Sequence, residues 1–254
     1  MGKFDPKIYE RDVYEEPIYS SWLKYTNQRD LLELFLTENF HKWCKTNPIS
    51  ILELGCGSGS AAQRIFSILE KNKISYSYLG VDPYQDQLNR WPQALVEKSN
   101  ITLMQGTVES FIPKQKFDLI LIIHALYYVD DLPETLIKVN SLGTTKLIVH
   151  HGEFGINEVQ EKFRSYVKSG PNIISTYHDV KRVLDSVNIP YELNVVDTKV
   201  DIRPCHDLKN KDGTNLIKFF LEHSELPEET LTQVSAFLKN KGDIIKQDDG
   251  YFFI

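Results

Sequence analysis

The fold of this chain is decided by the stretch ILELGCGSGS, residues 51–60. Its apolar start predicts a buried strand, and three glycines at alternate positions, Gly55, Gly57 and Gly59, then lead into an amphipathic segment with helical periodicity. Glycine permits positive φ and lets the backbone approach a ligand closely. The N–H groups of such a loop, and of the helix that follows, face the bound molecule. The stretch therefore predicts a ligand-binding turn between a strand and a helix.

A carboxylate follows at the spacing that a nucleoside requires. The second predicted strand, 76–81, runs into Asp82, which lies 23 residues after Gly59. In nucleoside-binding folds an acid about 20 residues beyond the glycine loop accepts hydrogen bonds from ribose hydroxyls. The alternative is that Asp82 is only a turn residue before Pro83.

The spacing of the glycines separates two kinds of cofactor. A dinucleotide fingerprint, G-x-G-x-x-G, needs its third glycine at the position of Ser60, whereas here it is Gly59. An acid, Glu53, also stands two residues before Gly55. This arrangement resembles motif I of the class I methyltransferases. The resemblance implies S-adenosyl-L-methionine as the cofactor, with the loop against its aminocarboxypropyl and ribose groups.

Beyond the loop, short apolar runs alternate with amphipathic stretches, as in βαβ units. We predict an α/β fold with a Rossmann-like, doubly wound, mostly parallel seven-stranded sheet whose last strand is antiparallel. Residues 1–46 are predicted to form an N-terminal helical cap or lid, and residues 47–254 the cofactor-binding core, with 201–245 a substrate-side insertion. The strands are expected at 49–54, 76–81, 101–105, 117–123, 146–151, 191–197 and 251–254. The helices are expected at 28–44, 61–71, 85–97, 132–141, 157–168, 178–187, 214–223 and 228–240.

Composition excludes several classes of protein. Charged residues make up 25% of the 254 residues and the net charge is −6, which gives no footprint for wrapping nucleic acid. The longest apolar run, 119–123, is far too short to cross a bilayer. The opening residues are too charged for a signal peptide, and the three cysteines show no metal-ligand spacing. We expect a cytoplasmic protein, monomeric, with a small-molecule substrate and neither a nucleic-acid nor a membrane partner.

The segment after the fourth strand indicates the type of methyl acceptor. Enzymes that methylate exocyclic amino groups of bases, or glutamine, carry Asn/Asp-Pro-Pro-Tyr there, whereas this chain has His124-Ala125-Leu126-Tyr127. The acidic cluster of the metal-dependent catechol type is also missing, so no metal is expected. His150 and His151 end the fifth strand, where alternation sends their rings to opposite faces, and we interpret both as structural.

Two further segments indicate which methyltransferase family the chain resembles. LYYVDDLPETL at 126–136 and DPYQDQ at 82–87 are similar to the histamine N-methyltransferase family. That resemblance extends from about Trp22 to the end of the chain. It implies cofactor contacts from Gly55, Asp82, Gln87 and Ile123, with Thr107 or Val108 near adenine. It also implies that His124 and Tyr128 line the substrate pocket as the catalytic residues. His124 could accept a proton, orient a hydrogen-bond donor of the substrate, or only line the pocket. We expect only one of Tyr127 and Tyr128 in the site and the other in the core.

The chain departs from that family at two substrate positions. The family reads its amine with a glutamate in the N-terminal helix, where this chain has Gln28. The family's asparagine near the last strand falls at about Gln247–Asp248, which makes Asp248 the expected substitute acid. We therefore predict a small amine or heterocyclic nitrogen as acceptor, with histamine a poor substrate. O- or carboxyl-methylation of a metabolite, and a non-catalytic cofactor-binding protein that acts through a partner, are the alternatives.

Overall fold

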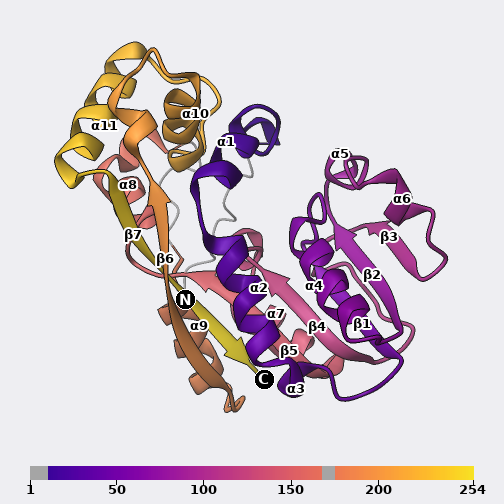
Figure 1. Ribbon diagram of the computed structural model, residues 1–254. Helices are drawn as coiled ribbons and strands as arrows, with labels where there is room; N and C mark the ends of the chain where they lie inside the picture. Colours follow the sequence, from indigo (N-terminus) through magenta and orange to yellow (C-terminus); the bar gives the residue numbers. More distant parts are fainter. Residues whose placement is uncertain (1–10, 168–174) are drawn as a thin grey trace. The chain divides into compact units, whose positions relative to one another are not determined.

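A seven-stranded sheet organises the chain, with the strand order β3-β2-β1-β4-β5-β7-β6 (Figure 1). The computed structural model describes residues 11–167 and 175–254, so residues 1–10 of the predicted cap and the predicted helix end at Lys168 lie outside the described residues. The strands are β1 (Ile49–Leu54), β2 (Tyr76–Asp82), β3 (Ile101–Gln105), β4 (Phe117–Ile123), β5 (Gly143–His151), β6 (Glu192–Asp201) and β7 (Ile244–Phe253).

The first five strands are parallel and the last is antiparallel to its neighbour β5. The parallel pairs are β1 with β2 and β4, β2 with β3, and β4 with β5. Lys146 of β5 and Ile254 exchange both backbone hydrogen bonds, at 2.9 and 3.0 Å. Such a mutual exchange occurs only between antiparallel partners. The predicted fold class, including the antiparallel last strand, is confirmed.

The helices connect these strands in the order of the chain. They are α1 (Ile18–Tyr25), α2 (Gln28–Glu38), α3 (Phe40–Trp43), α4 (Ser60–Lys71), α5 (Gln85–Leu88), α6 (Gln93–Val96), α7 (Leu132–Ser141), α8 (Ile156–Lys162), α9 (Tyr177–Ser186), α10 (Lys211–Phe220) and α11 (Glu228–Lys241). Short 3₁₀ turns are η1 (Arg11–Tyr14), η2 (Leu126–Tyr128), η3 (Arg164–Tyr166) and η4 (Arg203–His206). The helix α7 begins where the sequence signals it, because the Asp131 carboxylate accepts the Glu134 N–H at 2.8 Å and Pro133 follows the cap.

Several predicted boundaries were wrong for local reasons. The helix predicted over 85–97 is two short helices, because Pro92 precedes α6 and a proline cannot continue a helix from the preceding turn. The helix predicted over 28–44 is interrupted at Asn39, whose side-chain amide donates to the Phe35 carbonyl at 2.9 Å. The strand β7 begins at Ile244, seven residues earlier than predicted at Tyr251, because its polar middle is paired within the fold as described below.

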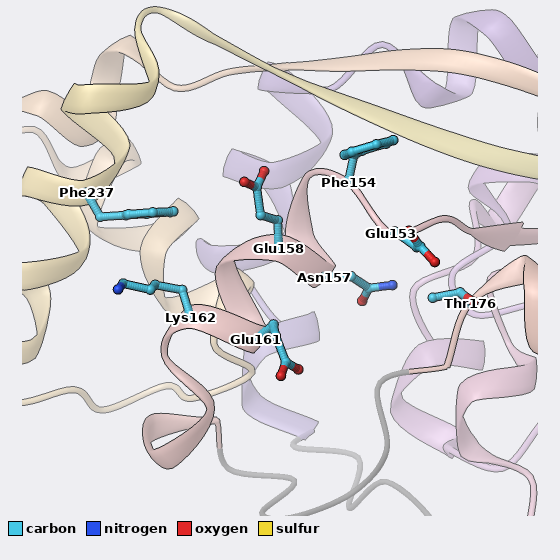
Figure 2. Close-up of a pocket in the computed structure, with 8 residues that line it drawn as sticks. All are labelled: Glu153, Phe154, Asn157, Glu158, Glu161, Lys162, Thr176 and Phe237. Atoms are coloured by element: carbon cyan, nitrogen blue, oxygen red, sulfur yellow. The ribbon is translucent and has the colours of Figure 1, made fainter.

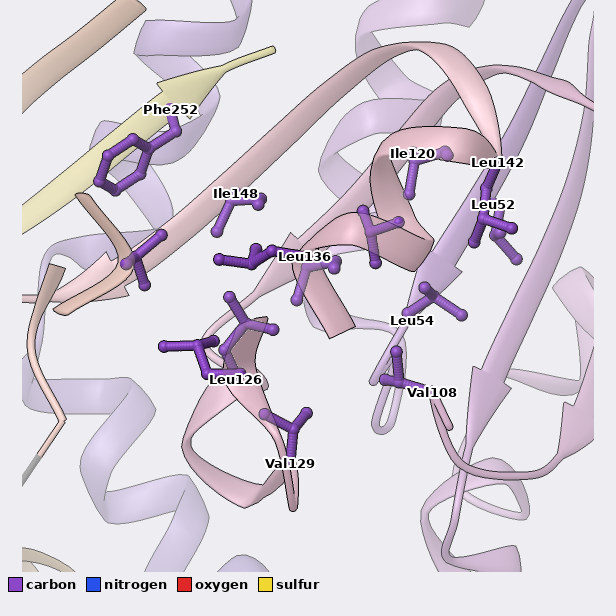
Figure 3. Close-up of a cluster of buried hydrophobic side chains, with 14 of the residues drawn as sticks. Leu52, Leu54, Val108, Ile120, Leu126, Val129, Leu136, Leu142, Ile148 and Phe252 are labelled. Carbon is purple, nitrogen blue, oxygen red and sulfur yellow. The ribbon is translucent and has the colours of Figure 1, made fainter. Parts of the chain in front are cut away.

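The chain divides into two compact units, each with its own core. Unit 1 comprises 1–28, 151–176 and 195–249, and unit 2 comprises 29–150, 177–194 and 250–254. In unit 2 the apolar residues of β1, β4 and β5 pack with those of α7 and α9, and Figure 3 shows Leu52, Ile120, Leu136 and Ile148 among them. In β4 six of the seven residues are buried, as expected for a parallel strand covered on both faces.

The core of unit 1 is aromatic and joins distant parts of the sequence. Trp22 of α1 stacks on Phe219 of α10, with ring centroids 4.8 Å apart. Val200 and Val234 are fully buried in the same cluster. The division into a cap over 1–46, a core and an insertion over 201–245 stays a prediction.

Candidate functional site

The glycine loop of unit 2 forms the predicted turn between β1 and α4. Gly55 has φ +78° and Gly59 has φ +81°, a region that side-chain-bearing residues rarely adopt. A Cβ on Gly55 would lie 2.3 Å from that of Ala125, so the loop passes tightly against the exit of β4. A Cβ on Gly57, in contrast, would meet nothing within 4 Å. The loop therefore presents open backbone at its middle glycine, which is a cradle for a ligand.

Asp82 is bound to that cradle. One carboxylate oxygen accepts the Gly57 N–H at 2.8 Å and the other accepts the Tyr84 N–H at 3.0 Å. The side chain is 6% exposed, and this burial raises the pKa of Asp82 while its two backbone donors lower it. A carboxylate has about four lone-pair positions. Two of them are used here, so two remain for a diol, and Asp82 fits a ribose at this point.

A buried acid lies behind the loop. Glu53, at the end of β1, is 2% exposed and accepts the Tyr78 hydroxyl at 2.6 Å. Burial raises the pKa of Glu53 from 4.5 to about 7, against the lowering effects of the Tyr78 hydrogen bond and of Arg29. The same burial, and the nearby Glu53, raise the pKa of Tyr78 well above its usual value.

Trp91 packs against the glycine loop. Its indole N–H donates to the Gly57 carbonyl at 2.9 Å, and a Cβ on Gly59 would lie 2.6 Å from its ring. The tryptophan reaches this position because the chain breaks between α5 and α6. Sequence reasoning missed it, although an aromatic residue directly before Pro92, within the predicted helix, was a visible signal.

The remaining predicted cofactor residues lie near the same edge of the sheet. Gln87 in α5 is buried, at 4% exposure. After β3, the Gly106 N–H donates to the Asp82 carbonyl at 3.0 Å. Thr107 follows, with its N–H donated to the Ser110 hydroxyl at 3.0 Å, and Val108 is buried. The structure thus places the stretch predicted near adenine directly after the strand that pairs with the Asp82 strand.

The exit of β4 carries the predicted catalytic group. Ile123 is buried, and His124 has φ +53°, an uncommon conformation for a residue other than glycine. The Nδ1 atom of His124 lies 3.0 Å from the Tyr127 hydroxyl. Tyr127 stacks on His150 with ring centroids 4.1 Å apart, and Tyr128 meets Tyr127 edge-on. Sparsely populated backbone conformations cluster at functional sites, so this geometry is consistent with His124 as a candidate functional residue. The expectation that a single tyrosine belongs to the site stays a prediction.

Unit 1 brings together a second polar group, which contains the predicted Gln28. The Gln28 amide donates to both carboxylate oxygens of Asp249, at 3.0 and 3.2 Å. His151 Nδ1 lies 2.9 Å from Asp249 Oδ1, and the Gln247 amide nitrogen lies 3.0 Å from the same ring nitrogen. Asp249 is fully buried. From the sequence, His151 at the carboxyl end of β5 was interpreted as structural, and Asp249 was not singled out.

Asp248 is directed elsewhere. Its carboxylate accepts the Phe154 N–H at 3.1 Å, and its backbone carbonyl accepts the Gly152 N–H at 2.6 Å. Neighbouring residues of a strand point to opposite faces, so the two acids of β7 have separate partners. Within unit 1, Asp249 is the acid that contacts Gln28.

A hollow of about 780 Å³ also lies in unit 1, around α8. Figure 2 shows its lining, which is Glu153, Phe154, Asn157, Glu158, Glu161, Lys162, Thr176 and Phe237. None of the residues predicted from sequence lines it. Glu158 forms an ion pair with Lys241, so part of its acidic lining is neutralised.

The fold and the loop define a class of protein. Ligands of open α/β sheets bind beyond the carboxyl ends of the strands. Here that edge carries an open glycine cradle and a buried acid with two lone-pair positions left for a diol. These residues fit the nucleoside part of S-adenosylmethionine, and the class is that of the S-adenosylmethionine-dependent methyltransferases.

Comparison with known proteins gives the family. A sequence model described as a methyltransferase domain matches residues 19–149, more than half of the chain, and the chain belongs to this methyltransferase family. The protein is accordingly an S-adenosylmethionine-dependent methyltransferase, as the sequence predicted. Among its relatives, a histamine N-methyltransferase of Cavia porcellus is 28% identical over 200 residues, covering 68% of this chain. The match spans 66% of that relative, just under two thirds of its length.

Solved structures are similar in fold. The YcgJ protein from Bacillus subtilis has a TM-score of 0.62 at 14% identity, covering 88% of this chain and 97% of its own. The mycolic acid cyclopropane synthase CmaA1, in complex with SAH and CTAB, has a TM-score of 0.56 at 16% identity, covering 89% of this chain and 84% of its own. In the part of the chain that the structure describes, every helix is too short or too polar to cross a membrane.

Proposed function

We propose that this methyltransferase transfers the methyl group to a nitrogen atom of a small amine or heterocycle. The observation that carries the proposal is the exit of β4, where His124, Tyr127 and Tyr128 follow the sheet and form an aromatic group. Methyl transfer requires a neutral lone pair on the acceptor, and an aromatic surrounding favours the neutral form of an amine by desolvation. The similarity to a histamine N-methyltransferase supports the same class of acceptor.

The chain's residues have separate tasks in this proposal. Bound S-adenosylmethionine supplies an activated methyl group on a sulfonium. Asp82 holds the ribose diol, the open backbone at Gly57 receives the cofactor, and His124 and Tyr128 orient the acceptor. The supporting cofactor contacts are assigned to Glu53, Gly55, Gly59, Gln87, Thr107, Val108 and Ile123. Holding two reactants in line can lower a barrier by about 7–11 kcal/mol.

The screen that tests this function uses labelled S-adenosylmethionine. Amines, heterocycles, phenols and carboxylic acids are offered in parallel, and each product is located by mass and NMR. We expect methylation on nitrogen. Products methylated only on oxygen or carboxyl groups would replace the proposal with the O-methylation alternative.

Gln28 sets an expectation for histamine. Gln28 is an amide, so position 28 offers a cationic substrate no carboxylate of its own. Its amide nitrogen donates to Asp249. We expect Gln28→Glu to raise kcat/KM for histamine, but by less than the roughly tenfold that a charge-assisted hydrogen bond gains over a neutral one, because the new carboxylate faces the buried Asp249 carboxylate. Gln233→Glu, on the exposed face of α11, adds the same charge as a control. Equal histamine kinetics in all three proteins would remove Gln28 from the substrate site.

A further inference from the structure

The turn that follows β3 in unit 2 engages the polar groups of Thr107. The Thr107 N–H donates to the Ser110 hydroxyl at 3.0 Å, and the Thr107 hydroxyl oxygen accepts the Ser110 N–H at 3.1 Å. The Thr107 carbonyl accepts the Phe111 N–H at 3.0 Å. Of the two residues predicted near adenine, Thr107 is therefore committed to its own turn. The backbone of residues 108 and 109 is the part of the turn left to meet a ligand.

A lysine of α7 holds that backbone. The Lys138 ammonium donates to the Val108 carbonyl at 2.9 Å and to the Glu109 carbonyl at 2.7 Å. Within residues 11–167 and 175–254 these carbonyls are the partners of both its hydrogen bonds, and no carboxylate forms an ion pair with it. Hydrogen bonds from a charged donor are roughly twice as strong as neutral ones. Lys138 thus fixes two successive peptide groups that lie 30 and 29 positions away in sequence.

These bonds set the direction of the neighbouring N–H groups. In a trans peptide the C=O and the N–H point in opposite directions. Because the Val108 carbonyl is directed at Lys138, the Glu109 N–H of the same peptide points away from that lysine. Among the described residues, neither this N–H nor that of Val108 has a hydrogen-bond partner. Backbone N–H groups of a folded chain are almost always paired with protein, water or ligand, so the turn offers donors to a bound group.

We propose that Lys138 is a positioning residue of the cofactor site, which aims the N–H groups of residues 108 and 109 at the adenine ring. This inference rests on the proposed function, which assigns Thr107 and Val108 to the cofactor. Adenine presents the ring nitrogens N1, N3 and N7 as hydrogen-bond acceptors. The turn presents donors, since its carbonyls are bound by Lys138, and the cation on each carbonyl polarises the peptide and strengthens its N–H as a donor. The turn therefore selects a base with an acceptor nitrogen at the contacted edge.

The turn has other anchors, so the loss of Lys138 should not unfold it. Val108 and Phe111 are buried in the apolar core of unit 2. The Glu109 carboxylate accepts the Asp130 N–H at 3.3 Å. Removing the ammonium should therefore change the direction of the two peptides and leave the turn in its place.

The first test measures base selectivity by calorimetric titration. S-adenosylhomocysteine is compared with analogues in which carbon replaces N1, N3 or N7 of the adenine. We expect the parent to bind one analogue at least about fivefold more weakly than S-adenosylhomocysteine, because a donor of the protein loses its partner. Lys138→Met keeps the apolar stem without the charge, and it should reduce this selectivity to less than about twofold while weakening S-adenosylhomocysteine itself.

Two further variants serve as controls. Lys138→Arg keeps a charged donor and should retain the selectivity of the parent. Lys71→Met removes the same charge from the exposed end of α4 and should bind every ligand as the parent does. Equal affinities of the parent for all the ligands would refute the proposal. Unchanged selectivity in Lys138→Met would also refute it, because a merely structural lysine would weaken all the ligands alike.

A second measurement decides the matter even if Lys138→Met does not fold. ¹H–¹⁵N NMR spectra of the parent protein are recorded with and without S-adenosylhomocysteine. We expect the amide proton of Val108 or Glu109 to move downfield on binding, and to move less with the analogue that binds weakly. Amide signals of both residues that stay in place would overturn the proposal.

The outcomes separate this inference from the proposed function. Only cofactor binding is measured, so methylation of nitrogen or of oxygen in the acceptor leaves the role of Lys138 unchanged. If Asp82→Ala weakens S-adenosylhomocysteine and Lys138→Met keeps the affinity and selectivity of the parent, the proposed cofactor site stands and the role of Lys138 is refuted. If neither variant changes the affinity, the proposed cofactor site fails and the inference fails with it.

Discussion

Replacing Glu53 with glutamine should change how stability depends on pH. Glu53 is 2% exposed, and burial raises its pKa from 4.5 to about 7. Between these two pH values the folded state keeps a proton that the unfolded chain releases. This retained proton stabilises the folded state. The stabilisation is complete below about pH 4.5, falls as the pH rises, and is lost above about pH 7. Each pH unit of this interval corresponds to about 1.4 kcal/mol, so the whole effect is about 3 kcal/mol.

The glutamine variant isolates this contribution. An amide does not titrate, and its oxygen can still accept the Tyr78 hydroxyl that Glu53 accepts at 2.6 Å. Relative to the parent, Glu53→Gln should therefore gain about 3 kcal/mol of unfolding free energy between pH 4.5 and pH 8. Urea unfolding of the ligand-free proteins at pH 4.5, 5.5, 6.5, 7.5 and 8, with m-values compared, measures the difference.

Two controls make the result specific. Glu38→Gln removes a negative charge from an exposed position at the end of α2 and should leave the pH dependence of the parent unchanged. Tyr78→Phe removes a hydrogen bond that lowers the pKa of Glu53, so the loss of stability should extend to higher pH. Parallel curves for the parent and Glu53→Gln would show that Glu53 is ionised in the folded protein, and the burial argument would be refuted.

The remaining predictions concern the loop, its acid and the exit of β4. Asp82→Ala should weaken S-adenosylhomocysteine at least tenfold in calorimetric titration, because the diol loses both acceptors; unchanged affinity would remove Asp82 from the site. Gly59→Ala should lower the free energy of unfolding by about 1–3 kcal/mol, because its Cβ would lie 2.6 Å from Trp91. In Gly57→Ala the new Cβ meets no protein atom within 4 Å, so this variant should lose only the stability that a φ of +51° costs an alanine, which is less than Gly59→Ala loses, while its Cβ blocks the cofactor. Equal losses of stability in the two variants would contradict this. His124→Ala should lower turnover in the labelled-methyl assay at constant cofactor affinity. If the variant turns over as fast as the parent, His124 only lines the substrate pocket.

Local patterns along the chain determined the class of fold and the cofactor. The strands β1 and β4 have the bounds that their apolar runs predicted, because a parallel strand buried on both faces is nearly continuous in apolar residues. The glycine loop and Asp82 could also be predicted from the sequence, because positive φ and a carboxylate after a strand each depend on one short segment of the chain. Pro92 likewise indicates the break before α6, within the helix that was predicted over 85–97.

Long-range pairing decided the rest. Residues 247–249 of β7 resemble a polar loop in sequence, and they form a strand because their side chains find partners elsewhere in the fold. Gln28 and Asp249 are hydrogen-bonded across 221 positions of sequence. No periodicity or motif encodes such a pair, because it depends on which strand lies next to β5 and on which face each residue occupies. The same holds for Glu53, whose pKa is raised by the burial that the assembled sheet imposes and by no property of its neighbours in sequence.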